Sequence, residues 1–198
     1  MPKIKFSLLS IIGGLTLLSS SAYAGVDAEV SYILNTLLFL IGGFLVMWMA
    51  AGFAMLESGL VTSKSVATIA AKNIGLYSIA GLMFWLVGYN LAYGIPEGGF
   101  IGSFLPWSDA SAVDTGYSDG SDWFFQMVFC ATTCSIVSGT LAERIKIWPF
   151  FLFCAILAGV IYPIEMGWQW GGGHLAAAGF SDFAGSTLVH SAGAAAAL

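Results

Sequence analysis

Long runs of residues without a charge dominate this sequence and restrict the folds it can adopt. Only 9% of its 198 residues are charged, whereas an average soluble domain has roughly 25% and uses them to cover its surface. Several uncharged runs are near or above the ~18 residues that a helix needs to cross a bilayer. They cover residues 32–56, 73–95, 123–142 and 147–164, and a fifth covers 183–198. The sequence therefore predicts an all-α integral membrane protein, a polytopic helical bundle.

The first residues have the pattern of a secretory signal. Lys3 and Lys5 precede an uncharged run at 6–18, and residues 19–24 end in Ala-Tyr-Ala. A basic segment, a short apolar segment and a small-x-small site predict a cleavable signal peptide at 1–24. The alternative is an uncleaved first transmembrane helix, but the run is shorter than the ~20 residues a span needs.

The charges outside the uncharged runs predict the orientation. The basic residues after the signal lie between the first and second runs or between the third and fourth, and they are Lys64, Lys72, Arg144 and Lys146. Basic loops stay in the cytoplasm. We therefore expect a multi-pass protein of the cell (inner) membrane whose mature N-terminus lies on the outer side. The opposite loop holds Glu97, Asp109, Asp114, Asp119 and Asp122. This charge distribution gives no nucleic-acid footprint.

Small residues interrupt the predicted spans, which otherwise form one domain from residue 25 to residue 198. They are Gly42, Gly43, Gly52, Gly75, Gly81, Gly88, Ser135 and Gly139. In lipid, small residues let helix backbones approach closely, so these positions are expected to be packing surfaces.

The third run carries two phenylalanines and several polar residues. Phe125 and Phe129 are four residues apart and share one helix face near the outer surface. They are either a stripe packed against a neighbouring helix or two rings above a pathway. The polar residues on the same helix could line that pathway or hydrogen-bond across helices, and their spacing does not decide; they are Gln126, Thr132, Thr133, Ser135 and Ser138.

The last stretch joins Trp170, a flexible triple glycine at 171–173, Asp182 and an uncharged helical run with His190. Asp182 can cap this helix, because a carboxylate accepts the free N–H groups of a first turn and complements the helix dipole. Counted from Phe183, His190 lies buried roughly 10 Å down the helix, about a third of the way through the bilayer core. An ionisable residue at that depth indicates function.

Three cysteines lie at membrane depth, and two of them, Cys130 and Cys134, share a helix face. With His174 or His190 they could suggest a metal site. Buried cysteine is more often a small hydrophobic residue, however, so neither a metal, a cofactor nor a disulfide with Cys154 is predicted. His174 is assigned no role.

Four segments in order and spacing resemble the ammonium transporter family, Amt/Mep/Rh. They are GFAMLESGLVTSKS at 52–65, FFQMVFCATTCSIVSGTLAER at 124–144, WGGG at 170–173 and DFAGSTLVH at 182–190. The resemblance covers essentially all of 32–198. It is far more specific than a lone histidine.

The resemblance implies a role for each site residue. Trp170 would help to recruit ammonium outside, Phe125 and Phe129 would gate the pore, and His190 would be one of two paired histidines inside. Asp182 would stabilise the outer site without touching substrate. Ammonium is attracted to the face of an indole, while a bare charge deeper in lipid is costly, so the ion would lose its proton and cross as ammonia.

The resemblance also implies an architecture and partners. Family members have about eleven spans in two inverted five-helix halves, so this chain is expected to be the first half, with His190 facing lipid or an unsealed groove. Ammonium or ammonia is the implied substrate, with methylammonium as an analogue, and a homotrimer and a cytoplasmic regulatory protein are implied partners. The chain is predicted not to be an enzyme. Two alternatives are an ammonium sensor on the same bundle and a membrane-embedded hydrolase using His190, Asp182 and a cysteine or serine.

Signal cleavage can be tested directly. N-terminal sequencing of the purified protein should begin at Gly25, because the small residues at 22 and 24 satisfy the signal peptidase. An intact Met1 or Pro2 would contradict cleavage and add a span to the topology.

Overall fold

The computed structural model describes residues 26–198, and all regular elements in this range are helices. They are α2 (Ala28–Leu60), η2 (Ser63–Ser65), α3 (Val66–Met83), η3 (Phe84–Gly88), α4 (Tyr89–Tyr93), η4 (Val113–Thr115), α5 (Asp119–Thr140), α6 (Ile147–Ile156), η5 (Leu157–Ile161), α7 (Tyr162–Gln169), α8 (His174–Ala177) and α9 (Leu188–Ala197). The π-helical turns η3 and η5 join α3 to α4 and α6 to α7 without a break. The predicted signal peptide at 1–24 lies outside the described residues.

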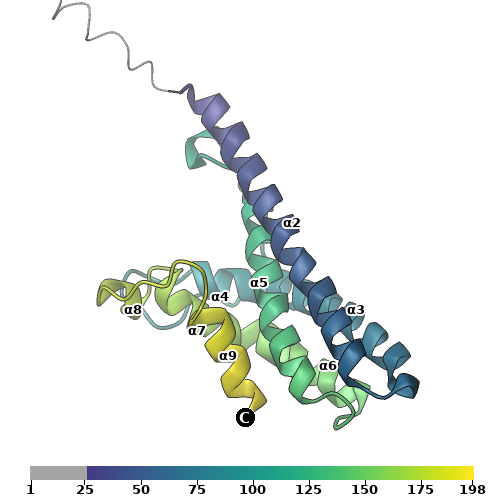
Figure 1. The fold of residues 1–198 in the computed structure, drawn as a ribbon. Coiled ribbons are helices and arrows are strands. Elements are labelled where there is room, and N and C mark those ends of the chain that lie inside the picture. The colour runs from purple at the N-terminus through teal and green to yellow at the C-terminus, as the bar shows by residue number, and fades with distance from the viewer. Residues whose placement is uncertain (1–25) are drawn as a thin grey trace, which may run out of the picture.

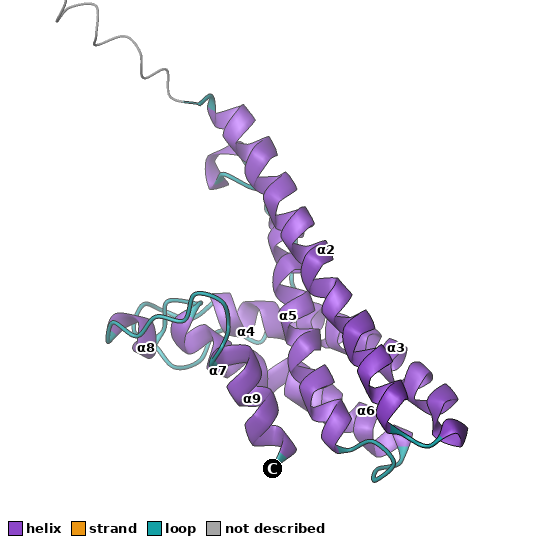
Figure 2. Cartoon of the chain, in the orientation of Figure 1, coloured by secondary structure: helices purple, strands orange, loops and turns teal. Residues whose placement is uncertain are grey.

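α5 is the central helix of the bundle. It packs against α2, α3 and α9, and Figure 1 shows it between the long α2 and the short α9. α3 packs on α6, and α4 packs on α7. Figure 2 shows only helices and loops in the described part of the chain, with a group of loops around α8.

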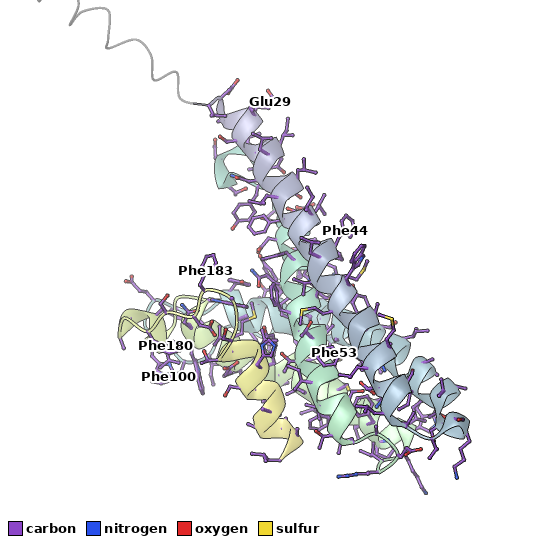
Figure 3. The ribbon with its side chains drawn as sticks, in the orientation of Figure 1. Glu29, Phe44, Phe53, Phe100, Phe180 and Phe183 are labelled. Atoms are coloured by element: carbon purple, nitrogen blue, oxygen red, sulfur yellow. The ribbon has the colours of Figure 1, made fainter. Side chains whose placement is uncertain are left out.

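Three helical stretches, Ala28–Leu60, Ser63–Tyr93 and Ile147–Ala177, are long and apolar enough to cross a membrane. The outer face of α2 exposes large apolar side chains such as Trp48 and Phe44, and Figure 3 shows Phe44 pointing away from the bundle. An apolar exterior of this kind suits lipid as the surrounding solvent.

The helices differ in length from the predicted runs. α2 continues to Leu60 instead of ending at 56, α3 begins at Val66 instead of 73, and α7 continues to Gln169 beyond 164. The uncharged runs end at charged residues by definition, whereas the folded helices continue through these residues. The last helix is shorter than its run, because α9 begins at Leu188 and not at Phe183. The boundaries of the spans within a bilayer stay predictions.

Two of these charged residues form a buried ion pair near one end of the bundle. Lys72 Nζ lies 2.8 Å from Glu57 Oε2, and both side chains are at most 5% exposed. Lys72 Nζ also donates to the carbonyl oxygen of Ser138 at 2.8 Å, while the Ser138 hydroxyl donates to Glu57 Oε2 at 3.0 Å. Phe150 presents its ring 5.2 Å from the ammonium group. The cluster joins α2, α3 and α5.

Lys72 is therefore not the loop residue that the orientation prediction assumed. The exposed basic residues that remain are Lys64, Arg144 and Lys146. They lie in the loops 61–65 and 141–146, which a hydrogen bond from the Thr62 N–H to Glu143 Oε1 holds together at 3.1 Å. We call this the basic end of the bundle.

Two acidic residues also depart from the prediction. Asp119 and Asp122 lie in the first turn of α5, not in the preceding loop, and Asp122 is buried. Carboxylates in that position complement the positive end of the helix dipole. We call this region, with residues 94–118, the acidic end.

Hydrogen bonds account for the hydroxyl groups buried along α5. Thr132 donates to the carbonyl oxygen of Val128 at 2.8 Å, and Ser135 donates to that of Ala131 at 3.1 Å. These local bonds satisfy polar groups that lipid and the core cannot. Of the polar residues that could have lined a pathway, these two serve the helix itself.

Several predicted packing glycines lie at close helix contacts. A Cβ added at Gly42 would lie 2.8 Å from the Phe125 ring, and one at Gly43 would lie 2.6 Å from the Phe124 ring. Close approach of α2 to α5 therefore requires glycine at both positions. Gly52 is different, because a Cβ there would meet no atom within 4 Å in the described part of the chain, so these residues provide no packing contact at this position.

The buried ion pair gives a stability prediction for the native gene product. Lys72→Met should lower the free energy of unfolding in detergent by about 3–5 kcal/mol, because it leaves the Glu57 carboxylate buried without its cation. Lys64→Met, at an exposed lysine of the same end, is the control and should change stability by no more than about 0.5 kcal/mol. The double variant Glu57→Gln/Lys72→Met should be more stable than Lys72→Met alone. Equal or greater loss in the double variant would contradict this account.

Candidate functional site

Three of the residues selected from the sequence meet in one cavity. It has a volume of about 270 Å³ and is lined by Tyr93, Phe125, Gln126, Phe129, Trp170 and Phe183. The Phe125 and Phe129 rings are 5.1 Å apart at 83°, and the Phe129 and Trp170 rings are 5.6 Å apart at 71°. These edge-to-face contacts are the arrangement that aromatic quadrupoles favour. The cavity thus has aromatic walls from α4, α5, the end of α7 and the loop before α9.

Neighbouring segments support this aromatic group from behind. Phe39 of α2 lies 5.3 Å from the Phe125 ring. Phe183 is fully exposed at the rim, and Figure 3 shows it pointing away from the ribbon in the loop before α9. Phe125, Phe129 and Trp170 are partly buried, so each ring has both a packed side and a side open to the cavity.

The end of α7 fixes Trp170. Its indole Nε1 donates to the main-chain oxygen of Asp182 at 2.7 Å. A Cβ added at Gly185 would lie 3.0 Å from the indole ring, and the φ of +77° at Gly185 also favours glycine. The loop before α9 therefore holds the tryptophan in place.

The triple glycine after Trp170 forms a tight, packed turn, contrary to the flexible segment that the sequence suggested. The Gly173 N–H donates to the Gly167 oxygen at 3.0 Å, and Gly172 has a φ of +77°. Gly171 packs directly on the Ala92 carbonyl, with no room for a side chain. Glycine is required here for close backbone contact, which orients Trp170.

Asp182 caps the beginning of α9 with both carboxylate oxygens. Oδ1 accepts the N–H groups of Gly185 at 2.9 Å and Ser186 at 3.1 Å. Oδ2 accepts the N–H groups of Thr187 at 2.8 Å and Leu188 at 2.9 Å, together with the Thr187 hydroxyl. Its side chain is thus occupied by the first turn, whose free N–H groups it satisfies.

These hydrogen bonds hold the carboxylate charged. Burial raises the pKa of Asp182, but hydrogen bonds from Thr187, Leu188 and Ser186 lower it more, to about 2. Because the folded pKa lies below the unfolded value of about 3.9, the cap stabilises fully above the unfolded pKa. That contribution is lost as the pH falls through about 2.

His190 lies elsewhere than predicted. It is the third residue of α9 (Leu188–Ala197), within the first turn, and not roughly 10 Å down a helix from Phe183. The five residues after Asp182 form the capped turn and not a helical stretch, because the carboxylate takes their N–H groups. His190 is also exposed and not buried, which agrees with the expectation that it faces lipid or an open groove.

The helix that carries His190, α9, packs on α5. The Thr133 hydroxyl lies 3.3 Å from the Phe129 oxygen and 3.4 Å from the Val189 oxygen. A Cβ added at Gly193 would lie 3.1 Å from the Thr133 oxygen. Val189 and the adjacent His190 therefore lie beside Thr133, about one helical turn beyond Phe129 along α5.

The cysteines and His174 lie in unrelated surroundings. Cys130, Cys134 and Cys154 are all buried and free, and Cys130 Sγ donates to the Ala158 oxygen at 3.4 Å. His174 begins α8 and stacks on Phe100 at 4.2 Å. Among residues 26–198, no group of three or more metal-binding side chains occurs.

Sequence reasoning missed a polar network beside the cavity. The Tyr89 hydroxyl donates to Asp122 Oδ2 at 2.7 Å, and Gln126 Nε2 donates to Asp122 Oδ1 at 3.3 Å. The i,i+4 spacing of Asp122 and Gln126 was the available signal. Assigning Asp122 to the loop hides this spacing, because the i,i+4 relation applies only when both residues lie in one helix.

The sequence model of the Ammonium Transporter Family matches residues 37–198. Ammonium transporter Amt2 of Archaeoglobus fulgidus is 41% identical over 169 residues, which are 78% of this chain and 35% of that protein. The ammonium transporter of Aquifex aeolicus is 35% identical over 182 residues, which are 89% of this chain and 43% of that protein.

Two solved structures are similar in fold. One is that of a protein named Sensor Amt Protein, with a TM-score of 0.73 and 34% identity over 80% of this chain and 41% of that one. The other is a mutant of Candida albicans Mep2, with a TM-score of 0.72 and 25% identity over 86% of this chain and 39% of that one. This chain spans less than half the length of each of these proteins.

The Asp182 cap gives a prediction for hydrogen exchange in the native gene product. Asp182→Ala should speed amide exchange at 185–188 by about 2–30-fold, which corresponds to the roughly 0.5–2 kcal/mol lost with a helix cap. Mass spectrometry of peptides covering 183–190 measures this. Asp114→Ala, at an exposed carboxylate of the acidic end, should leave these peptides unchanged. Equal exchange in wild type and Asp182→Ala would exclude a capping role.

Proposed function

Because this chain belongs to the Ammonium Transporter Family, we propose that it forms the outer mouth and one wall of a transmembrane pathway for ammonium and ammonia. The observation that carries the proposal is the cavity in which Trp170, Phe129 and Phe125 meet. Its walls are aromatic rings, whose faces attract a small cation without binding it as tightly as a carboxylate would.

Trp170 is the recruiting residue in this mechanism. A cation over an indole face gains about 0.5–2 kcal/mol, depending on how far it is desolvated. The hydrogen bond from the indole Nε1 to the Asp182 oxygen fixes the plane of the ring. Asp182 thus acts on recruitment through Trp170, and its carboxylate is occupied by the cap.

Phe125 and Phe129 are the gate, and His190 is the pore histidine beyond it. A bare ammonium ion would pay a large desolvation cost past two phenyl rings, so it gives up its proton to water at the outer mouth and crosses as ammonia. Imidazole can hydrogen-bond ammonia or relay a proton near neutral pH. The link from Thr133 to Phe129 and Val189 supports this order of gate and histidine along one path.

The surroundings of the protein belong to the same proposal. The exposed basic residues support a basic end that faces the cytoplasm. The chain would then cross the cell inner membrane several times, with its N-terminus on the outer side. A homotrimer and a cytoplasmic regulatory protein follow from the family resemblance. Transport by this route needs neither a cofactor nor an enzymatic step, and methylammonium is the analogue suited to measurement.

An ammonium sensor is the second candidate, and the similarity to the solved structure of Sensor Amt Protein favours it. Both candidates share the aromatic cavity, and net uptake separates them. The hydrolase alternative finds less support, because both Asp182 carboxylate oxygens are taken by the cap and cannot orient His190.

Uptake of labelled methylammonium by the native gene product, in cells without their own ammonium transporters, tests the proposal. Trp170→Leu should raise KM about 2–30-fold, since leucine replaces the bulk of the ring but not its quadrupole. Trp168→Leu is the matched control, because Trp168 donates to the Phe100 oxygen away from the cavity, and it should leave KM unchanged. An unchanged KM in Trp170→Leu would remove the recruiting role, and no uptake in wild type would favour the sensor.

The gate is tested in the same assay. Phe129→Ala should alter the flux or the preference for methylammonium while the protein stays abundant in the membrane, because one side of the ring is open. A collapse in abundance would instead identify Phe129 as a packing residue, whose truncation typically costs about 3–5 kcal/mol.

A further inference from the structure

A groove between the continuous stretch α6–η5–α7 and the last helix, α9, holds a carboxylate in apolar surroundings. Its volume is about 610 Å³, within the range of roughly 300–1,000 Å³ that is common for ligand pockets. Leu157 and Ile161 of η5 and Ala192 and Ala195 of α9 are among the residues that line it. Glu165 of α7 is the charged residue in this lining.

The carboxylate of Glu165 has no partner within the described part of the chain. The side chain is partly exposed. Oε2 is buried without a hydrogen bond, whereas Oε1 is not among the buried atoms, and no hydrogen bond from residues 26–198 reaches either oxygen. Hydrocarbon offers no donor, so a carboxylate in such a groove is costly unless a cation or donor comes to it.

The described lysines and arginines lie far from Glu165 along the bundle. They are Lys64, Lys72, Arg144 and Lys146, which belong to the basic end and to the ion pair near it. Glu165 lies three residues before Trp168, whose indole donates to the Phe100 oxygen of the acidic end at 2.8 Å. A permanent cation for Glu165 therefore has to come from outside residues 26–198.

The groove opens toward the apolar exterior of the bundle, near the level of the lipid headgroups. Ile161 in the groove is 50% exposed, and Leu152 and Ile156 on the preceding helix are exposed as well, as suits a face that meets lipid. Glu165 lies four residues before the end of α7 at Gln169, which is about 6 Å along the axis. Near a helix end, a side chain can reach the boundary between hydrocarbon and headgroups.

We propose that this groove binds a phospholipid whose headgroup carries a primary ammonium group, with Glu165 accepting its N–H groups and the apolar lining holding an acyl chain. Phosphatidylethanolamine has this chemistry. Its ammonium group supplies the counter-charge that the described residues lack, so the carboxylate stays ionised at this depth. The inference goes beyond the proposed function, because it needs only the position of the bundle in a membrane and no transport step.

The headgroups of related phospholipids provide the contrast. The quaternary ammonium group of phosphatidylcholine has no N–H to donate, and the headgroup of phosphatidylglycerol carries no cation at all. With the same acyl chains, all three lipids offer the groove the same apolar contact. A difference in affinity between them therefore measures the contact with the carboxylate.

Native mass spectrometry of the native gene product in detergent, with each of these lipids added in turn, tests the assignment. Wild type should bind the first phosphatidylethanolamine about threefold or more tighter than phosphatidylcholine, because a charge-assisted hydrogen bond is gained. Glu165→Gln should remove this difference. Glu97→Gln, at an exposed carboxylate of the acidic end outside the groove, is the matched control and should keep it.

A second variant tests the groove itself without touching the carboxylate. Ala195→Phe should fill the space beside Glu165 and abolish the preference for phosphatidylethanolamine, whereas Leu152→Phe, on the exposed face outside the groove, should keep it. If Glu165→Gln does not accumulate in the membrane, this pair decides the question. A preference that survives in Ala195→Phe would overturn the site.

Three further results would also contradict the proposal. Equal affinity of wild type for phosphatidylethanolamine and phosphatidylcholine would exclude recognition of the ammonium group. A preference that persists in Glu165→Gln would exclude this carboxylate. If Ala195→Phe fails to accumulate while Leu152→Phe does, another part of the protein fills the groove and no lipid binds there. None of these results bears on uptake through the aromatic cavity, so the proposed function is judged separately.

Discussion

Polar groups inside this bundle depend on partners within the protein, because the lipid around it offers none. The central helix α5 shows how the chain provides such partners. Its buried hydroxyls bond to carbonyl oxygens of the preceding turn, and near its C-terminal end Ser138 joins the Glu57–Lys72 pair. This ion pair allows one charged residue of α2 and one of α3 to lie in the core near the basic end of the bundle.

A second carboxylate, that of Asp182, organises the turn before α9 in a different way. Asp182 accepts the N–H groups of the turn before α9, and its main-chain oxygen receives the indole N–H of Trp170. One residue therefore positions both the helix of His190 and the tryptophan of the cavity. The physical link between these two sites is a helix cap, so a change in the cap reaches the aromatic walls and the histidine together.

The cavity is walled by aromatic rings from α4, α5, the end of α7 and the loop before α9. In the proposed function the faces of these rings attract the cation. One of these rings, Phe125, also packs on α2, through Phe39 and the close approach at Gly42. Helix packing and substrate attraction thus use the same side chains, so a substitution in the cavity can change both KM and the abundance of the protein.

The sequence by itself determined that the chain is a helical membrane bundle and that it resembles ammonium transporters, because hydrophobic runs and motif spacing are local properties. That Trp170 lies beside Phe125 and Phe129 was implied only by this resemblance, and the fold brings the three rings together. Only the tertiary structure decided where helices end, since whether a charge stops a span depends on a partner distant in sequence, as for Glu57 and Lys72. The same holds for His190, whose depth and exposure follow from the turn that Asp182 caps. It also holds for the buried Asp122, whose partner Tyr89 lies 33 residues away in the sequence. A local sequence pattern cannot predict such pairs of residues, because their members come together only when the chain folds.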